Sequence, residues 1–243
     1  MNWHEVWTRK GLESPGPEVD PLEAALMLDG YGSVANSFLP VSSMPHFAAR
    51  VLEILQPRDN DSVYEVGCGS GAFLGTIDRS RPGLQLGGCD YSSTLVEACH
   101  RYFPQITTEV REAIDIDPSP VAHHLLAFSV FHYFPDLEYA ATVVGLMGAK
   151  ASTSVSILDV PDLALRPESE AMRRGQLSEG EYDAHYAGLE HLYYERAWLA
   201  EQFPADEWAV SVEDQSVAGY LNTPFRFNVF ARRQAAVTRQ PPA

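Results

Sequence analysis

The segment VYEVGCGSGAF, residues 63–73, joins a β-rich run to three alternating glycines and then to an amphipathic helix. Glycine suits this junction because the strand must turn sharply into the helix and because a ligand can then lie against bare backbone. The first helical turn also presents unpaired N–H groups to a ligand. Glu65 precedes the glycines, and a carboxylate at the end of an inner strand needs a partner. The segment therefore predicts a ligand-binding strand–turn–helix, with a ligand-free glycine turn as the alternative.

Strand and helix patterns alternate around this segment. Short apolar runs predict strands over residues 62–67, 84–90, 106–110, 125–130 and 153–160. Amphipathic runs predict helices over residues 46–55, 73–80, 93–103 and 137–150. A further helix is expected over 195–203, followed by strands over 208–214 and 225–233. Repeated strand–helix–strand order predicts an α/β fold, with a parallel sheet and helices on both faces.

Composition narrows the class of protein. The chain has 243 residues, of which 45% are hydrophobic, enough for one large domain. A net charge of −16 argues against nucleic acid and membrane surfaces as partners, and mildly favours a neutral or cationic substrate. No apolar run approaches the roughly 18–20 residues that span a bilayer, and no secretory signal pattern is recognisable. With three cysteines and no CxxC pair, we expect a cytoplasmic protein without a metal site.

A second carboxylate follows the next predicted strand. Asp90 ends LQLGGCD, the position from which an acidic side chain binds both hydroxyls of a ribose in doubly wound sheets. A dinucleotide enzyme satisfies the same pattern, so the glycines and Asp90 leave an NAD-dependent oxidoreductase open. That class often relies on a Tyr/Lys pair, and no Y-x-x-x-K occurs in this chain.

The longer motifs resemble those of class I S-adenosylmethionine-dependent methyltransferases of the small-molecule type. EVGCGSGAF and GGCDYS resemble the first two family motifs, and VREAIDID, SVFHYFPDLEYA, ILDVPD and FRFNVFARR resemble later strand ends. The resemblance covers about residues 45–233 and implies a Rossmann-like, doubly wound, seven-stranded sheet with the last strand antiparallel. Two departures are His123-His124, where the family usually has Phe-Asp, and residues 148–152 in place of a Pro-Gly-Gly turn.

The resemblance also implies a domain plan and a cofactor site. An N-terminal helical segment (1–57) would cover the cofactor, a methyltransferase domain (58–233) would hold it, an insertion (161–194) would form a substrate lid, and 234–243 would be a loose tail. The implied S-adenosylmethionine contacts are Tyr31, Glu65, Gly67, Cys68, Gly69, Gly71, Asp90, Tyr91, Glu112, Ala113 and Ser129. Among them, Tyr91 would pack on the adenine and Glu112 and Ala113 would face it.

The expected reaction is methyl transfer to an oxygen or nitrogen of a small molecule, such as a sugar or natural-product scaffold. His132, just beyond the fourth strand, is the candidate general base, and its alternative is a structural histidine bonded to backbone. Candidate substrate contacts are Tyr133, Asp159, His191 and Tyr194. A cofactor-binding protein of this fold that transfers no methyl group is a further alternative. The oligomeric state stays open, a homodimer included.

Overall fold

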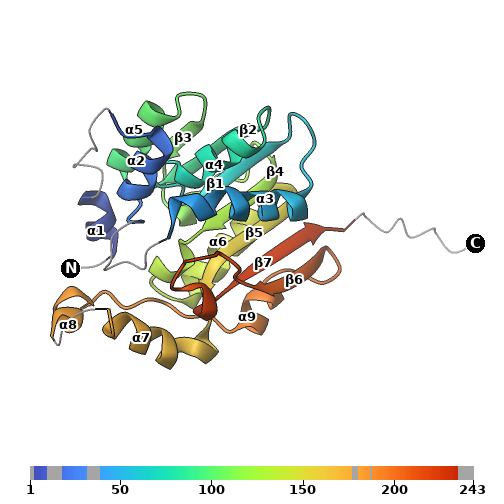
Figure 1. Cartoon of the computed structure of the whole chain (residues 1–243). Coiled ribbons are helices and arrows are strands. Elements are labelled where there is room, and N and C mark those ends of the chain that lie inside the picture. The colour runs from blue at the N-terminus through green and yellow to red at the C-terminus, as the bar shows by residue number, and fades with distance from the viewer. Residues whose placement is uncertain (1–2, 10–17, 32–38, 177–179, 187, 235–243) are drawn as a thin grey trace, which may run out of the picture.

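One seven-stranded sheet organises the molecule, which we describe from a computed structural model for residues 3–9, 18–31, 39–176, 180–186 and 188–234 (Figure 1). The strands are β1 (Ser62–Val66), β2 (Gln85–Asp90), β3 (Thr107–Val110), β4 (Ala122–Phe128), β5 (Ala151–Pro161), β6 (Trp208–Asp214) and β7 (Arg226–Arg233). Their order is β3-β2-β1-β4-β5-β7-β6, and β7 runs antiparallel to both of its neighbours. The predicted doubly wound sheet with an antiparallel last strand is therefore confirmed.

Helices cover both faces of the sheet (Figure 1). They are α1 (Trp3–Arg9), α2 (Pro21–Leu28), α3 (Met44–Leu55), α4 (Ala72–Ser80), α5 (Ser93–Tyr102), α6 (Leu137–Lys150), α7 (Arg166–Arg174), α8 (Glu181–Tyr186) and α9 (Arg196–Glu201). Side-chain caps fix two helix starts: Asp20 accepts from the Leu22 N–H at 2.9 Å, and Asp136 from the Tyr139 N–H at 2.8 Å. Helix α6 has the bounds expected from its apolar period.

Strand alternation assigns each inner residue of β4 to one face. Leu126 and Phe128 pack in the cluster that includes residues of α3 and α4, whereas Leu125 and Ala127 pack in the cluster that includes α6. All four side chains are buried, which is why this strand reads as a continuous apolar run. The carboxyl ends of the parallel strands then meet at one edge of the sheet, where ligands bind in folds of this class.

The stretch 161–194 contains helices that the sequence pattern does not predict. The sequence of helix α7 lacks the apolar stripe that predicts an amphipathic helix, and its buried residues are Ser169 and Arg173. Both α7 and α8 extend beyond one end of the sheet (Figure 1). The predicted tail lies outside the described residues except for residue 234. No helix within the described ranges is both long and apolar enough to cross a bilayer.

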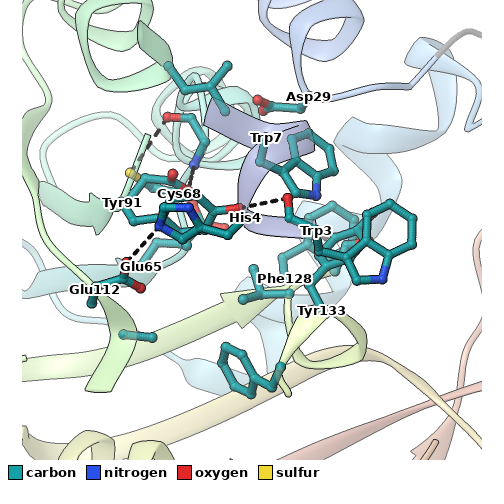
Figure 2. A pocket seen from close by; sticks show the side chains of 18 of the residues that line it. Trp3, His4, Trp7, Asp29, Glu65, Cys68, Tyr91, Glu112, Phe128 and Tyr133 are labelled. Carbon is teal, nitrogen blue, oxygen red and sulfur yellow. Dashed lines mark hydrogen bonds and ion pairs between the residues drawn. The ribbon is translucent and has the colours of Figure 1, made fainter. Parts of the chain in front are cut away.

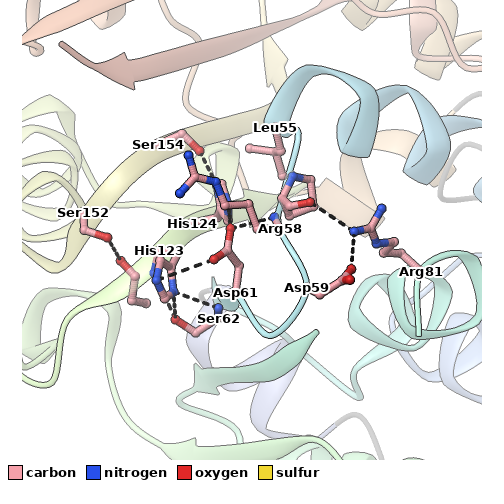
Figure 3. Close-up of polar contacts among 12 residues, drawn as sticks. Leu55, Arg58, Asp59, Asp61, Ser62, Arg81, His123, His124, Ser152 and Ser154 are labelled. Carbon is pink, nitrogen blue, oxygen red and sulfur yellow. Dashed lines mark hydrogen bonds and ion pairs between the residues drawn. The ribbon is translucent and has the colours of Figure 1, made fainter. Parts of the chain in front are cut away.

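His123 and His124 lie at the amino-terminal end of β4 (Figure 3). His124 is buried, with Nδ1 at 2.8 Å from Ser154 Oγ and Nε2 at 3.3 Å from Asp61 Oδ2. His123 Nδ1 accepts from the Ser62 N–H at 3.0 Å. These contacts resemble a Ser–His–Asp relay, but Ser154 belongs to β5, which pairs with β4 on one side and β7 on the other, and its side chain is buried. The cluster joins β1, β4 and β5 and has a structural role.

Candidate functional site

A cavity of about 450 Å³ opens over the carboxyl ends of β1, β2 and β4 and beneath α1 (Figure 2). Its wall includes most of the residues that the sequence assigns to the cofactor: Tyr31, Glu65, Gly67, Cys68, Gly69, Asp90, Tyr91, Glu112, Ala113 and Ser129. Gly71 instead forms the N-cap of α4, just behind the cavity wall. The topology therefore brings residues from distant parts of the chain to one hollow.

The glycine turn has the left-handed backbone that the sequence predicts. Gly67, Gly69 and Gly71 have φ angles of +71°, +53° and +82°, which side chains with a Cβ rarely adopt. Protein side chains, and not only the cavity, lie directly beside these glycines. A Cβ on Gly69 would lie 2.5 Å from Asp29 Oδ1, and one on Gly67 would lie 2.5 Å from a methyl group of Val130. The glycines are therefore required by protein packing in addition to any ligand.

Three carboxylates surround the turn. Asp90 accepts hydrogen bonds from the Gly69 N–H at 3.0 Å and the Ser92 N–H at 2.9 Å, so it also fixes the loop. Burial raises the pKa of Asp90 to about 6, although these two hydrogen bonds oppose the shift. Asp29, from the end of α2, accepts from the Ser70 N–H at 2.8 Å. This arrangement concentrates negative charge at one end of the cavity.

Glu65 is the least satisfied of these acids. Its side chain is buried, and none of the described residues donates a hydrogen bond to its Oε2. Burial raises the pKa of Glu65 well above its usual value, and the charges of Asp29 and Asp90 raise it further. An unpaired buried carboxyl oxygen facing a cavity calls for a donor or a cation from a ligand.

Helix α1 covers the end of the cavity where Tyr91 and Glu112 lie (Figure 2). The His4 ring stacks on the Tyr91 ring, with centroids 4.4 Å apart and planes 12° from parallel. His4 Nε2 also lies 3.0 Å from Glu112 Oε1. An imidazole thus lies between the two residues that the sequence assigned to adenine.

Strained backbone marks the strand ends on the other side of the cavity. Ser129, after β4, and Asp159, in β5, have φ angles of +57° and +61°, which are unusual for residues with a side chain. Ser129 Oγ donates to Asp159 Oδ2 at 2.8 Å, and Ser129 lines the cavity. Asp159 itself is buried, and Tyr220 and Gln215 also donate to its carboxylate. The structure thus places Asp159 in a hydrogen-bond network behind Ser129.

The candidate base is likewise one layer behind the cavity. Tyr133 lines the cavity, whereas His132 is buried and its ring packs against Tyr133 with centroids 3.9 Å apart. Burial holds the pKa of His132 well below its usual value, and Arg226, His191 and Arg173 lower it further. His132 is therefore neutral near pH 7 and lies out of direct reach of a cavity ligand.

Two other candidate substrate contacts also lie away from the wall. His191 packs under Trp3, with ring centroids 5.0 Å apart, and contacts the Arg173 guanidinium through Nδ1. Burial lowers the pKa of His191 well below its usual value, and Arg173 adds to the shift. Tyr194 lies in the hydrophobic core and donates to the Phe131 carbonyl at 2.7 Å. The insertion reaches the cavity through Gly188 and Glu190 instead.

Several cavity residues escaped the sequence interpretation. Trp3 and Trp7 of α1 line the cavity and pack on Tyr133, with ring centroids 4.8 and 5.2 Å apart. Trp3 and Trp7 are four positions apart, a spacing typical of one helix face, but the spacing does not indicate where that helix packs. Asp29 follows α2, a helix that the sequence interpretation omitted. In the described part of the chain, no three His, Cys, Asp or Glu side chains are placed to hold a metal ion.

The fold of this chain is similar to the folds of several solved proteins. No known family model matches the chain. The solved structure of magnesium protoporphyrin IX methyltransferase from Synechocystis PCC 6803 with bound SAM is similar, with a TM-score of 0.57 and 12% identity over 95% of this chain and 91% of that one.

Two further structures show the same likeness. Plantazolicin methyltransferase BpumL in complex with SAH matches with a TM-score of 0.63 and 12% identity, over 94% of both chains. An O-methyltransferase family protein from Burkholderia thailandensis matches with a TM-score of 0.54 and 14% identity, over 80% of this chain and 58% of that one. The chain therefore has the class I S-adenosylmethionine-dependent methyltransferase fold.

Proposed function

We propose that the protein is a methyltransferase that uses S-adenosylmethionine to methylate an oxygen or nitrogen of a small molecule. The observation that carries this proposal is Glu65, whose buried Oε2 has no hydrogen-bond donor among the described residues and faces the cavity. The cofactor is a cation that carries an ammonium group and a sulfonium. Such a ligand complements a hollow lined by Asp29, Glu65 and Asp90.

The remaining residues fit the other parts of this cofactor. Asp90 has a carboxylate for the ribose hydroxyls, and the Tyr91 ring and Glu112 offer a stacking face and an acceptor for the adenine. Tyr31 and Ser129 lie where the methionine part would pass. We include Gly71 as a residue that shapes the turn. The sheet order, with its antiparallel β7, also differs from the 3-2-1-4-5-6 order of dinucleotide enzymes, which weighs against NAD.

The chemistry needs alignment more than proton transfer. When bound, S-adenosylmethionine supplies an activated methyl group, so the protein has to orient the acceptor and exclude water. Positioning of this kind contributes about 7–11 kcal/mol to a reaction barrier. Trp3, Trp7 and Tyr133 offer flat apolar walls for that purpose. Because His132 is behind Tyr133, we assign it a positioning role.

The same geometry supports a proposed domain plan. We propose that segment 1–57 covers the cofactor, since α1 lies over the cavity, and that insertion 161–194 covers the acceptor, since Glu190 reaches the wall. Cys68, Cys89 and Cys99 are all buried and free, which suits the cytoplasmic location that we propose.

Calorimetry with S-adenosylmethionine, S-adenosylhomocysteine and NAD⁺ tests the cofactor assignment. We expect both sulfur compounds to bind and NAD⁺ to fail. Glu65→Gln should weaken binding of S-adenosylmethionine, whereas Asp206→Asn, in the exposed turn before β6, should not. Formation of S-adenosylhomocysteine with a pool of small-molecule acceptors, followed by mass spectrometry, tests transfer. Tight cofactor binding without any product across broad acceptor pools would favour a binding protein of the same fold.

A further inference from the structure

Three aromatic side chains form one end of the cavity (Figure 2). Trp3 and Trp7 come from α1, and Tyr133 comes from the 3₁₀ turn that follows β4. The Tyr133 ring centroid lies 4.8 Å from that of Trp3 and 5.2 Å from that of Trp7. All three side chains are half-buried and line the cavity, so part of each remains open to a ligand. We call these three residues the aromatic wall.

Neighbouring segments hold the aromatic wall in place. Trp3 Nε1 donates to the Glu190 carbonyl at 2.9 Å, and the Trp3 ring stacks on His191 with planes 24° from parallel. The Tyr133 ring packs on buried His132, with centroids 3.9 Å apart. A wall that is already ordered binds a rigid, flat ligand with little further loss of side-chain entropy.

The aromatic wall lies apart from the groups that suit the ribose and adenine. In the sheet order, β1 separates β2 and β3 from β4. Tyr91 follows β2 and Glu112 follows β3, whereas Tyr133 follows β4, so these groups lie on opposite sides of the glycine turn that ends β1 (Figure 2). A cofactor bound across the ends of β1 and β2 therefore leaves the aromatic wall for the acceptor.

The charge around the cavity is mainly negative. Its acidic lining residues are Asp29, Glu65, Asp90, Glu112 and Glu190. Arg111 is the one Lys or Arg among the described lining residues, and its guanidinium already bonds to Glu109 at 2.9 Å. A negatively charged acceptor would be repelled by this surplus of carboxylates, whereas a neutral or cationic one would not. A cation is also attracted to the faces of Trp and Tyr rings.

We propose that the methyl acceptor is a planar aromatic molecule without negative charge, whose ring packs against Trp3, Trp7 and Tyr133. The inference rests on the proposed function, since it names the class of molecule that the acceptor side takes. Aromatic rings make stacked and edge-to-face contacts with such a wall in addition to the burial of apolar area. A sugar also packs on aromatic rings, but each of its hydroxyls needs a polar partner, and Trp3 Nε1 is already bonded to Glu190.

Four small probes test this proposal: phenethyl alcohol, cyclohexylethanol, phenethylamine and phenylacetate. Each is titrated into the full chain saturated with S-adenosylhomocysteine, and its dissociation constant is measured by NMR. Burial of apolar area alone favours cyclohexylethanol, the more apolar of the two alcohols. We expect the reverse order, with phenethyl alcohol bound about threefold or more tightly, because a flat ring makes contacts that a puckered ring does not. Phenylacetate should bind about fivefold or more weakly than phenethylamine.

Two results would overturn the proposal: cyclohexylethanol binding as tightly as phenethyl alcohol, or phenylacetate binding as tightly as phenethylamine. A matched pair of variants separates contact with the ring from general packing. Tyr133→Phe keeps the ring and should keep the preference for phenethyl alcohol, whereas Tyr133→Leu should lose it. Melting curves show whether each variant is folded. A preference of unchanged size in folded Tyr133→Leu would contradict the assignment.

A second measurement uses the unaltered protein and locates the probe. The chain has four tryptophans, each with one indole N–H signal in a nitrogen-correlated NMR spectrum. Phenethyl alcohol should shift the signals of Trp3 and Trp7. The signals of Trp198 and Trp208, which pack on Tyr194 and Phe203, should stay in place. A saturating probe that leaves Trp3 and Trp7 unshifted would refute the proposal.

The proposed function and this inference fail in different ways. If S-adenosylhomocysteine does not bind, the proposed function fails, and the titrations of the ligand-free protein, read at the indole signals of Trp3 and Trp7, still decide whether the wall takes an aromatic ring. If S-adenosylhomocysteine binds and the aromatic preference is absent, the inference about the acceptor alone fails.

Discussion

The protonation of Asp90 should control cofactor affinity. The side chain is buried, and burial raises the pKa of Asp90 from 3.8 to about 6 in the ligand-free protein. The ionised form accepts hydrogen bonds from ribose hydroxyls far better than the neutral acid. Affinity should therefore be lost as the pH falls through about 6. At pH 5 roughly a tenth of Asp90 is ionised, so binding should be about tenfold weaker than at pH 7, equivalent to about 1.4 kcal/mol.

The assay is calorimetric titration of S-adenosylmethionine at pH 5, 6, 7 and 8, with Asp90→Asn as the comparison. The variant should bind more weakly at pH 8, by about 1.5–3 kcal/mol, because it lacks a charged acceptor. It should also lose part of the pH dependence. Glu65 titrates too, since burial raises its pKa, so the share of Asp90 is the difference between the two curves. Asp90 also holds the Gly69 and Ser92 N–H groups, so a melting curve must show that the variant is folded. Identical pH profiles for both proteins would refute the assignment.

Three further predictions follow from neighbouring geometry. Gly69→Val should abolish cofactor binding in calorimetry and destabilise the fold by a few kcal/mol, since the new Cβ meets Asp29 at 2.5 Å on a φ of +53°; unchanged affinity would contradict this. His4→Ala should tighten S-adenosylmethionine binding about threefold to tenfold, because the imidazole stacked on Tyr91 must leave before adenine can stack there; weaker binding would mean that α1 closes over the bound cofactor. Burial lowers the pKa of His132, so below pH 6.5 this histidine is protonated in the unfolded protein before it is protonated in the folded protein. The free energy of unfolding should therefore fall by up to about 1.4 kcal/mol per pH unit as the pH drops, and His132→Asn should show a smaller fall. Denaturant titrations at pH 7, 6 and 5 measure that difference, and equal slopes would argue against it.

The parts of the site that the sequence predicts best are local. Glu65, the glycines and Asp90 each occupy a fixed place relative to a strand end, and the sheet brings strand ends together. Their positions follow from strand–turn–helix chemistry, without knowledge of tertiary packing. Sequence patterns also located the seven strands of the described residues, and the inner strands β4 and β5 were marked by nearly continuous apolar runs.

The parts that the sequence misses depend on packing between distant segments. Trp3 and His4 line the cavity because α1 packs beside α5 and over the cavity, and no local pattern encodes that packing. His132 and Tyr133 are adjacent in one 3₁₀ turn, and the sequence does not indicate that Tyr133, and not His132, lines the cavity. Arg226 itself looks like an ordinary strand residue in the sequence. Its burial emerges only once β5 and β7 are paired.

The position of β7 has a consequence for how the protein is made. Within the described chain, β6 pairs with β7 alone, and β7 lies between β5 and β6 although it is synthesised after both. As the polypeptide leaves the ribosome, β6 has no strand to pair with and β5 keeps one open edge until β7 emerges. Open strand edges can pair with other strands, so this interval exposes the nascent chain to incorrect strand pairing. Because β7 also supplies Asn228, whose Oδ1 accepts from the Asp159 N–H at 2.9 Å, the hydrogen-bond network behind Ser129 can be completed only after β7 has been synthesised.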